Sequence, residues 1–570
     1  MTAPSIATGS PRPLAASARL MALGTLVSRA SGFARVVVVT NVLGATYLAN
    51  VYQSANSIPN LLFELLAAGV LQAVLVPALI SALNARGRIG AGQLAGLVMG
   101  WGGLVLGLIV GLGIVGAPTI MRTLTSGVSD PVVRADQIRI GTVFLWWFLP
   151  QILIYLANTV AVALLNIDGR FALAAVAPVI NNVIVIGAYL TFAAVRPAGP
   201  VTLGIGSAEQ LILAAGTTLG VVAFCAPTIL SAARRFPCAP RLAGDRTALR
   251  RLVVDGVWAL VFVAGTQSFL FVTLLVFNAT AGSVAIYQLV WVVFLLPYSV
   301  ALVPIITTRF PAAARAAAVE DWGSYAAVMS GGVRSLLFLG APTAGLVIGG
   351  AGPVSRLLVR GDVAERSEDI AHGIVAFGVG LVAYALLMFA VRGLYAVGDT
   401  LTPAVVNSAT AILGIVVVRW AGSGWSSATV VLGVGVVHSL MSATAASVLW
   451  IVLARRIRLR DMVHEDEDEA RPTASAVTPA RSSRSGSLAA VFVRALMSGA
   501  VVAVVTSAIG VMIQNHSVVS DLVVLVSAAL FALVAAPICF GATNGSGAFA
   551  MIASLGADDA PSPRGGSKRR

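Results

Sequence analysis

Long apolar segments alternate with short polar ones along almost the whole chain. A helix needs about 20 mostly apolar residues to cross a bilayer, and fourteen segments come close to or exceed this length. Their approximate bounds are 18–41, 50–83, 93–121, 138–165, 171–194, 208–232, 249–278, 284–308, 325–350, 371–397, 402–419, 427–454, 489–512 and 520–541. The pattern predicts an all-α polytopic membrane protein with about 14 transmembrane helices.

Composition agrees with a membrane protein and argues against other classes. Of 570 residues, 58% are hydrophobic and 11% charged, whereas a soluble domain carries about 25% charged residues. The three cysteines and four histidines show neither a disulfide framework nor metal-ligand spacing. No G-x-x-x-x-G-K-S/T motif for nucleotides occurs. We therefore expect a transporter, not an enzyme, with no catalytic residue, metal or cofactor, and driven by the membrane potential or a coupling ion.

The basic residues predict how the chain is oriented in the membrane. The formal net charge is +14, and an even number of spans places both termini on the same side. By our count about 25 of the basic residues fall on that side, and basic loops face the cytoplasm. The opposite loops 42–49, 279–283 and 513–519 contain no Lys or Arg. Both termini are therefore predicted to be cytoplasmic, and the charge indicates topology rather than binding to nucleic acid.

The spans and loops divide the chain into seven predicted parts. They are a cytoplasmic tail at 1–17, an N-terminal six-helix lobe at 18–232, a basic cytoplasmic loop at 233–248, a C-terminal six-helix lobe at 249–454, a disordered cytoplasmic linker at 455–488, a helix pair at 489–541 and a cytoplasmic tail at 542–570. The linker carries an acidic run at 465–469 and then Ser, Ala, Pro and Arg, a composition that cannot form a core. A plain solvated linker is favoured over a regulatory segment.

An internal repeat relates the two predicted lobes. Pro178 is followed by Asn182 and Pro403 by Asn407, and each pair lies about 100 residues after a Leu-Val-Pro sequence, at 75–77 and 302–304. We expect each Leu-Val-Pro to end a span. Repeats in the same orientation occur in transporters built from two halves related by an axis along the membrane normal.

Two arginines lie inside the first span. Each of Arg29 and Arg35 costs about 2.5–3.5 kcal/mol at the centre of a membrane helix on insertion scales. At 100° per residue they lie about 120° apart around the helix, so both can face a broad cavity. We favour a hydrated, anion-attracting cavity, because guanidinium groups bind phosphate through paired hydrogen bonds. The alternative is that they extend to the membrane surface or form structural ion pairs.

The second span begins with a polar face formed by Asn50, Asn56, Asn60 and Glu64. Pro59 is expected to kink this helix, because it removes one backbone hydrogen bond. The asparagines either line the cavity or bond neighbouring helices. Glu64 is either a proton or cation site or the partner of one of the two arginines.

A tight turn precedes the eleventh span. Gly398 and Asp399 lie just before Pro403, which is near the first position of the helix; Asp399 is thus a capping and turn residue. Arg392 lies near a predicted cytoplasmic helix end, where its side chain can extend to the membrane surface.

Several of these motifs together resemble the MviN/MurJ family. They are Ser28-Arg-Ala-Ser-Gly-Phe-Ala-Arg35, Leu43-Gly44-Ala45, Ile58-Pro-Asn-Leu-Leu62, Val76-Pro77, Gly282-Ser283-Val284, Leu296-Pro297 and Arg392-Gly-Leu-Tyr-Ala-Val-Gly-Asp-Thr-Leu-Thr-Pro403. The resemblance extends over about residues 18–541. It implies a flippase of the multidrug/oligosaccharidyl-lipid/polysaccharide exporter superfamily, with a central cavity between the lobes and a lipid-facing groove formed by the last two helices. It also implies that Arg29 and Arg35 are cavity arginines, and that Ser28, Gly32, Pro59, Arg392, Asp399 and Pro403 have structural or gating roles.

The chain departs from this family at three places. Phe63 and Glu64 replace basic residues, Asn50 replaces a common acidic residue, and Val292 lies where a cavity arginine is found. The resemblance therefore implies a cavity that is less positive than that of the family's best-studied branch, which bears on which lipid-linked glycan is carried.

These features predict a flippase for lipid II, the undecaprenyl-diphosphate-linked peptidoglycan precursor, working by alternating access in the bacterial cytoplasmic membrane. Its partners are then the precursor, membrane lipids and proteins of cell-wall synthesis or division. One alternative is an exporter of another lipid-linked glycan, or a cation-coupled drug antiporter. A second alternative is a non-transporting scaffold for wall-synthesis enzymes, with the acidic run at 465–469 as its docking segment.

Overall fold

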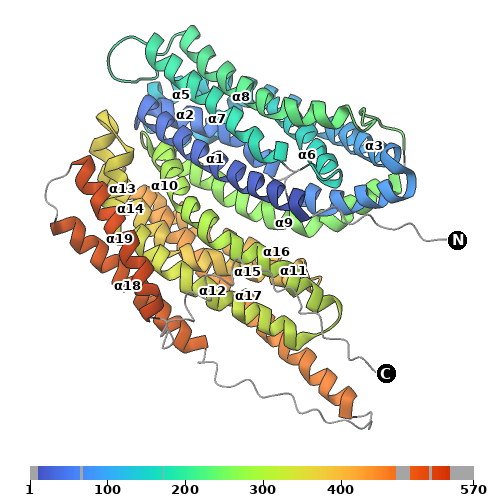
Figure 1. The fold of residues 1–570 in the computed structure, drawn as a ribbon. Helices are drawn as coiled ribbons and strands as arrows, with labels where there is room; N and C mark the ends of the chain where they lie inside the picture. Colours follow the sequence, from blue (N-terminus) through green and yellow to red (C-terminus); the bar gives the residue numbers. More distant parts are fainter. Residues whose placement is uncertain are drawn as a thin grey trace. The chain divides into compact units, whose positions relative to one another are not determined.

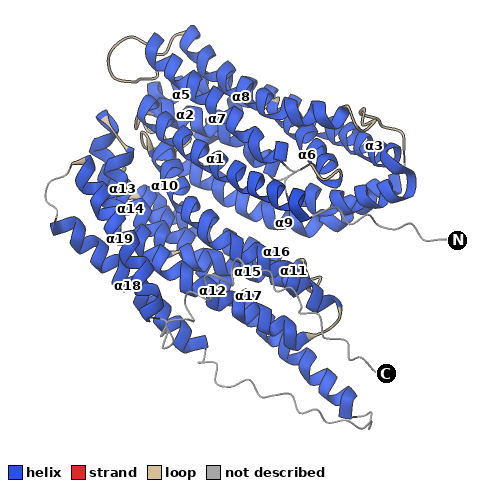
Figure 2. Cartoon of the chain, viewed as in Figure 1, coloured by secondary structure: helices blue, strands red, loops and turns tan. Residues whose placement is uncertain are grey.

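The computed structural model describes residues 11–64, 69–170, 172–244, 246–469, 488–512 and 517–539. Every regular element in these ranges is a helix (Figure 2). Eleven of the helices are long and apolar enough to cross a membrane, or twelve if the bent pair at Gly361–Val379 and Leu381–Ala396 is counted as one span. The all-α polytopic class is confirmed, and the predicted number of 14 spans is approximate.

A break within one helix and the short described part of another account for some of the difference between the predicted and the observed number of spans. The described spans include Leu75–Val115, which is counted once although it holds parts of two predicted spans; the chain leaves the helical conformation between those parts, at Arg86 and Gly87. Near the C-terminus, the helix Val518–Cys539 is not among the eleven, because its searched apolar stretch ends at Ala532.

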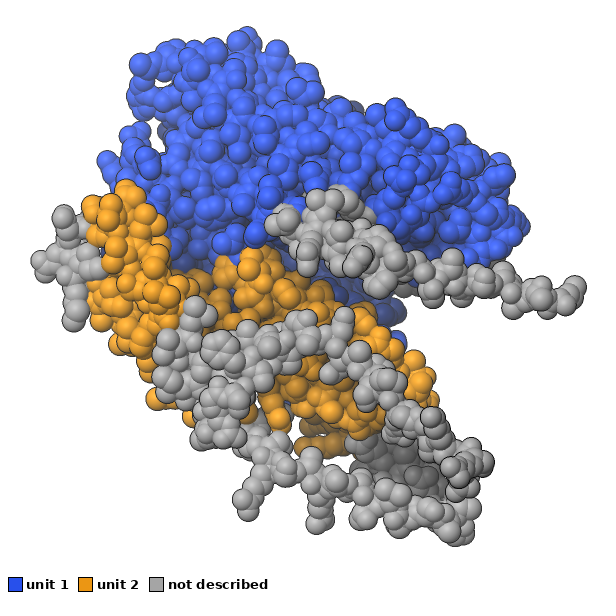
Figure 3. Space-filling model, viewed as in Figure 1, with its two compact units in different colours: residues 1–296, 354–453 blue, residues 297–353, 454–570 orange. Residues whose placement is uncertain are grey.

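The chain forms two compact units, coloured separately in Figure 3: residues 1–296 with 354–453, and residues 297–353 with 454–570. This division differs from the predicted lobes, because the first unit includes both the N-terminal half and much of the predicted C-terminal lobe. The described helices of the first unit (Figure 1) are α1 (Pro11–Leu43), α2 (Tyr47–Phe63), α3 (Gly69–Val115), α4 (Ala117–Leu124), α5 (Pro131–Phe148), α6 (Gln151–Ile167), α7 (Ala172–Val195), α8 (Ser207–Ala233), α9 (Arg246–Phe277), α10 (Ser283–Pro297), η3 (Gly361–Arg366), α14 (Ser367–Val379), α15 (Leu381–Ala396), α16 (Leu401–Ala421), η4 (Gly422–Gly424), most of α13 (Ala351–Leu358) and the larger part of α17 (Val430–Glu469).

The second unit contains η2 (Tyr298–Leu302), α11 (Val303–Ala318), α12 (Trp322–Gly349), α18 (Leu488–Met512) and α19 (Val518–Cys539). The predicted C-terminal pair, α18 and α19, packs together and also against α12. Close approach of α12 and α18 depends on glycine: a Cβ on Gly499 would lie 2.8 Å from the carbonyl oxygen of Ala341. Asp321 caps α12 by accepting a hydrogen bond from the Ser324 backbone N–H (2.8 Å), and the hydrogen bonds from Ser324 lower the pKa of its carboxyl.

The repeat predicted from Pro178 and Pro403 has a structural counterpart within the first unit. Asn182 on α7 donates to Ser31 Oγ on α1 (2.9 Å), and Asn407 on α16 donates to the Phe262 carbonyl on α9 (2.8 Å). The two asparagines thus make equivalent contacts in the two halves. The Leu-Val-Pro sequences do not end helices as predicted, because Pro77 lies inside α3 and residues 302–304 lead from η2 into α11.

Parts of two predicted non-helical segments are helical. Helix α1 starts at Pro11, inside the predicted tail, and α17 continues to Glu469, through the acidic run of the predicted linker. Charged residues there do not end the helix, because Glu and Arg have good helix propensity. The rest of the linker, residues 470–487, and the tail at 542–570 lie outside the described residues.

Candidate functional site

The two arginines of α1 lie on different sides of the helix. Ser28, Ser31 and Gly32 face α7: Asn182 Nδ2 lies 3.5 Å from the Ser28 carbonyl oxygen and would lie 3.6 Å from a Cβ on Gly32. At 100° per residue, Arg35 lies near this face and Arg29 about 100° away from Ser28. Ser28 and Gly32 therefore serve helix packing.

Neither arginine forms an ion pair with a described acidic residue. Arg29 is exposed and Arg35 is half-buried. The structural ion pairs considered as an alternative are thus absent from the described part of the chain, which leaves both guanidinium groups with hydrogen-bond donors to offer.

Arg35 lies near a group of tyrosines that the sequence pattern did not single out. They are Tyr52, Tyr155 and Tyr189. Tyr52 is fully buried, and its hydroxyl bonds to Tyr189 (2.9 Å) and Thr217 (2.6 Å). The pair Tyr52-Gln53 recurs as Tyr287-Gln288 in the second half. This repeat is the sequence signal by which Tyr52 could have been found.

Of the two roles considered for Asn50, the structure shows the bonding of neighbouring elements and not the lining of a cavity. Its side chain is fully buried and donates to the carbonyls of Phe277 (3.3 Å) and Thr280 (2.7 Å), while accepting from the Val284 backbone N–H (3.0 Å). Its amide is therefore occupied in tying α2 to the turn between α9 and α10.

The other polar residues of α2 form one stripe. Asn56, Asn60 and Glu64 follow each other at intervals of four residues, so they lie on one side of the helix. Asn56 is half-buried and Asn60 exposed, and Asn60 donates to the Asn56 carbonyl (3.0 Å). Glu64 is exposed at the end of α2, with no ion pair to either α1 arginine, so the pairing alternative for Glu64 is wrong. Pro59 is buried within α2, which remains helical around it.

The turn before α16 has the predicted capping role. Asp399 Oδ1 accepts from the Thr402 backbone N–H (3.0 Å). The backbone N–H of Asp399 bonds to Leu394 and that of Gly398 (φ +79°) to Tyr395, the pattern of a Schellman motif. Pro403 is buried at the start of α16, and Arg392 is exposed on α15.

The side chains of the described residues give no cluster of three potential metal ligands. They give instead unpaired guanidinium groups, amides and a carboxylate on apolar helices, which is typical of substrate or ion pathways in membranes. Many apolar spans with such groups define a multi-pass membrane transporter.

The comparisons with known proteins identify which transporter this is. The family model described as "Lipid II flippase MurJ" matches residues 39–533, so the chain belongs to the MurJ family of lipid II flippases. It is a transporter rather than an enzyme, and a multi-pass protein of the bacterial plasma membrane.

Curated relatives agree. The chain is 28% identical over 401 residues to a "Probable lipid II flippase MurJ" from Rhizobium tropici, covering 68% of this chain and 73% of the relative. It is 25% identical over 389 residues to the "Lipid II flippase MurJ" of Burkholderia cenocepacia, covering 66% and 72%.

Solved structures share the fold. The lipid II flippase MurJ in an inward closed conformation matches with a TM-score of 0.70 and 16% identity, covering 91% of this chain and 98% of that one. An inward-facing MATE-family multidrug transporter matches with a TM-score of 0.62 and 15% identity, covering 76% and 96%.

Proposed function

We propose that this lipid II flippase works by alternating access, with Arg29 and Arg35 receiving the diphosphate of the precursor. The observation that carries this proposal is that both guanidinium groups stand on an apolar helix without a carboxylate partner among the described residues. Burying an unpaired charge costs many kcal/mol, so a diphosphate needs such donors to cross the bilayer.

The other polar residues receive lesser roles in this proposal. Asn56 and Asn60 offer amide groups to the sugars of the precursor, while its polyprenyl tail stays in the lipid. Glu64 serves as the proton or cation site, and the membrane potential or an ion gradient drives the cycle. Asn50, whose amide is occupied, is not part of this site.

The test is a leaflet-resolved assay of fluorescent lipid II in vesicles that contain the purified full-length chain. Arg29→Ala and Arg35→Ala should each lower the rate of flipping at least tenfold, because each removes a donor for the diphosphate. Arg419→Ala is the matched control, since Arg419 is exposed on α16; it should retain the wild-type rate. All variants should reach the membrane in equal amounts. Full activity of both α1 variants would disprove their assignment.

The substrate itself is tested in the same vesicles. Phe63 and Glu64 stand where basic residues are common in the resembling family, so a second polyprenyl-diphosphate glycan should be compared with lipid II. Faster flipping of lipid II supports lipid II as the substrate, whereas faster flipping of the second glycan would assign that glycan as the substrate instead.

We propose that the protein partners are proteins of cell-wall synthesis or division, and that they contact the cytoplasmic segment around residues 461–488. Deleting residues 461–488, which removes the acidic run at 465–469, tests the scaffold alternative. Retained flipping and wild-type growth would show that transport, not docking, is the essential activity.

A further inference from the structure

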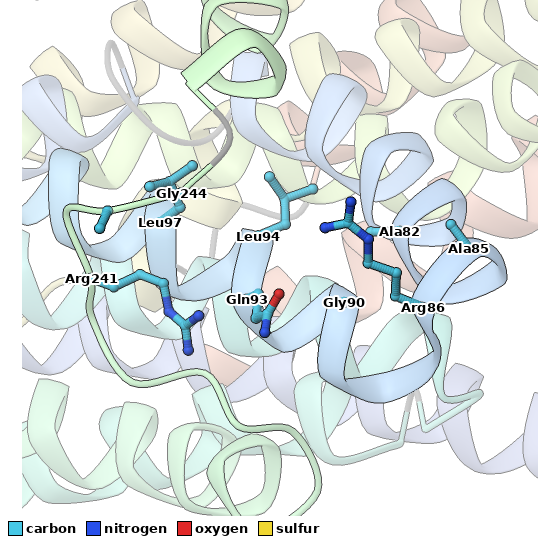
Figure 4. A pocket seen from close by; sticks show the side chains of 10 residues that line it. Ala82, Ala85, Arg86, Gly90, Gln93, Leu94, Leu97, Arg241 and Gly244 are labelled. Carbon is cyan, nitrogen blue, oxygen red and sulfur yellow. The ribbon is translucent and has the colours of Figure 1, made fainter.

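A pocket of about 270 Å³ lies on the first unit, where α3 meets the segment that follows α8 (Figure 4). Its polar walls are Arg86, Gln93 and Arg241. Small and apolar residues complete it: Ala82, Ala85, Gly90, Leu94, Leu97, Ala243 and Gly244. None of the residues proposed to bind the precursor lies here, so the pocket calls for a separate explanation.

The break in α3 forms one side of the pocket. Gly87 has a positive φ of 62°, which glycine adopts without steric cost, and the helix is kinked there. The kink brings Arg86 close to Gly90, where a Cβ would lie 2.6 Å from the Arg86 Cβ.

The segment at 237–244 forms the other side and is held at several points. A Cβ on Gly92 would lie 2.8 Å from Pro237, the Arg241 backbone N–H donates to the Gly96 carbonyl (3.0 Å), and Trp101 Nε1 donates to the Leu242 carbonyl (3.1 Å). The backbone of Arg241 is thus fixed. Its guanidinium group lies beside Gln93 (Figure 4).

Three arginines near the pocket share one carboxylate, whereas the two arginines in the pocket have none among the described residues. Asp168 pairs with Arg88 (2.8 Å), Arg170 (3.5 Å) and Arg235 (3.5 Å). Arg86 and Arg241 form no ion pair with any described acidic residue. Two like charges facing one small space favour an anion between them.

We propose that this pocket binds a phosphate group, carried by an anionic membrane lipid or free in solution. Guanidinium groups match phosphate oxygens in geometry and charge, and the Gln93 amide adds a neutral donor. Basic pockets between membrane helices on the cytoplasmic side bind lipid headgroups in this way. The site goes beyond the transport function and does not depend on it.

Thermal unfolding of the purified full-length chain in a neutral detergent tests the proposal. A ligand that binds the folded state raises the unfolding midpoint with its concentration. The probes are inorganic phosphate, dioctanoylphosphatidylglycerol and zwitterionic dioctanoylphosphatidylcholine, with sodium chloride at matched ionic strength. The wild type should show saturable stabilisation by phosphate, by phosphatidylglycerol or by both, and the more potent probe identifies the source.

The double variant Arg86→Gln/Arg241→Gln should bind at least tenfold more weakly, with an unchanged midpoint when no ligand is added. The matched control is Arg234→Gln, because Arg234 is exposed near this end of the unit but outside the pocket; it should respond like the wild type. Equal responses of the double variant and the wild type, or stabilisation by sodium chloride alone, would overturn the site. Flipping by the double variant is measured in parallel, so that a failure here is distinct from a failure of the transport proposal.

Discussion

Three asparagines of α2 show how the surroundings decide the role of a side chain. Asn50 is fully buried and bonded to three backbone groups. Asn60 bonds within its own helix, and Asn56 is half-buried and free of side-chain bonds to the described residues. Only Asn56 and Asn60 therefore offer an amide to a ligand. Residue type and spacing alone predicted a larger ligand-accessible polar face on α2 than the structure shows.

Replacing Asn50 by Ala should destabilise the protein by about 2 kcal/mol, because the buried Val284 N–H would lose its partner and the carbonyls of Phe277 and Thr280 would each lose one hydrogen bond. Asn56→Ala is the control on the same helix and should change stability by less than about 0.5 kcal/mol. Thermal unfolding in detergent measures both variants. Equal midpoints for the two would contradict the structural role of Asn50.

At the scale of elements, α3 accommodates a loop along a row of glycines. Gly92, Gly96 and Gly100 recur every four residues, and the segment at 237–241 lies against them. A side chain at Gly96 or Gly100 would collide with the carbonyl oxygens of Ala239 and Arg241, respectively. A glycine row in a membrane helix usually indicates contact with another helix, but these three glycines contact a segment without regular secondary structure.

Gly100→Ala should therefore release this segment from α3, and Cys238 reports on the release. Burial raises the pKa of the Cys238 thiol above its ordinary value, which lowers the thiolate fraction and slows alkylation at neutral pH. In a Cys225→Ala/Cys539→Ala background, maleimide labelling should be several-fold faster in Gly100→Ala. Gly107→Ala should label like the parent, because a Cβ there meets nothing within 4 Å. Unchanged labelling of Gly100→Ala would argue against docking.

At the scale of the whole molecule, the distribution of arginine predicts an orientation. Arg86, Arg88, Arg170 and Arg235 lie in parts of the chain that meet at one end of the first unit. Membrane proteins retain basic loops in the cytoplasm, so this end should be cytoplasmic and both termini should lie on that side.

Reporter fusions test this orientation. A reporter active only in the cytoplasm should be active after residue 86, after residue 235 and at the C-terminus, and inactive after residue 48 or 515. The reverse pattern would invert the proposed direction of access to Arg29 and Arg35. A C-terminal fusion that alone differs would place an odd number of spans in the chain.

Much of the fold and part of the site can be predicted from the sequence. Apolar runs decide which segments leave water, so the all-α class and most spans are confirmed. Local spacing also predicted the turn at Asp399 and the repeated asparagines. In the structure Asp399 caps α16, and Asn182 and Asn407 make corresponding contacts in the two halves. Predicted ends were less accurate at Pro11, Pro77 and Glu469, because helix propensity and packing decide where a helix ends.

The sequence by itself determined that the chain enters the membrane and which polar residues enter with it. Only the tertiary structure decided what those residues meet. Asn50 bonds to residues 227–234 positions away, and the backbone N–H of Arg241 bonds to Gly96, which lies 241 − 96 = 145 positions earlier. Such contacts depend on how helices pack in three dimensions. Hydrophobic periodicity reports only which face of a segment is apolar and does not encode its distant partners.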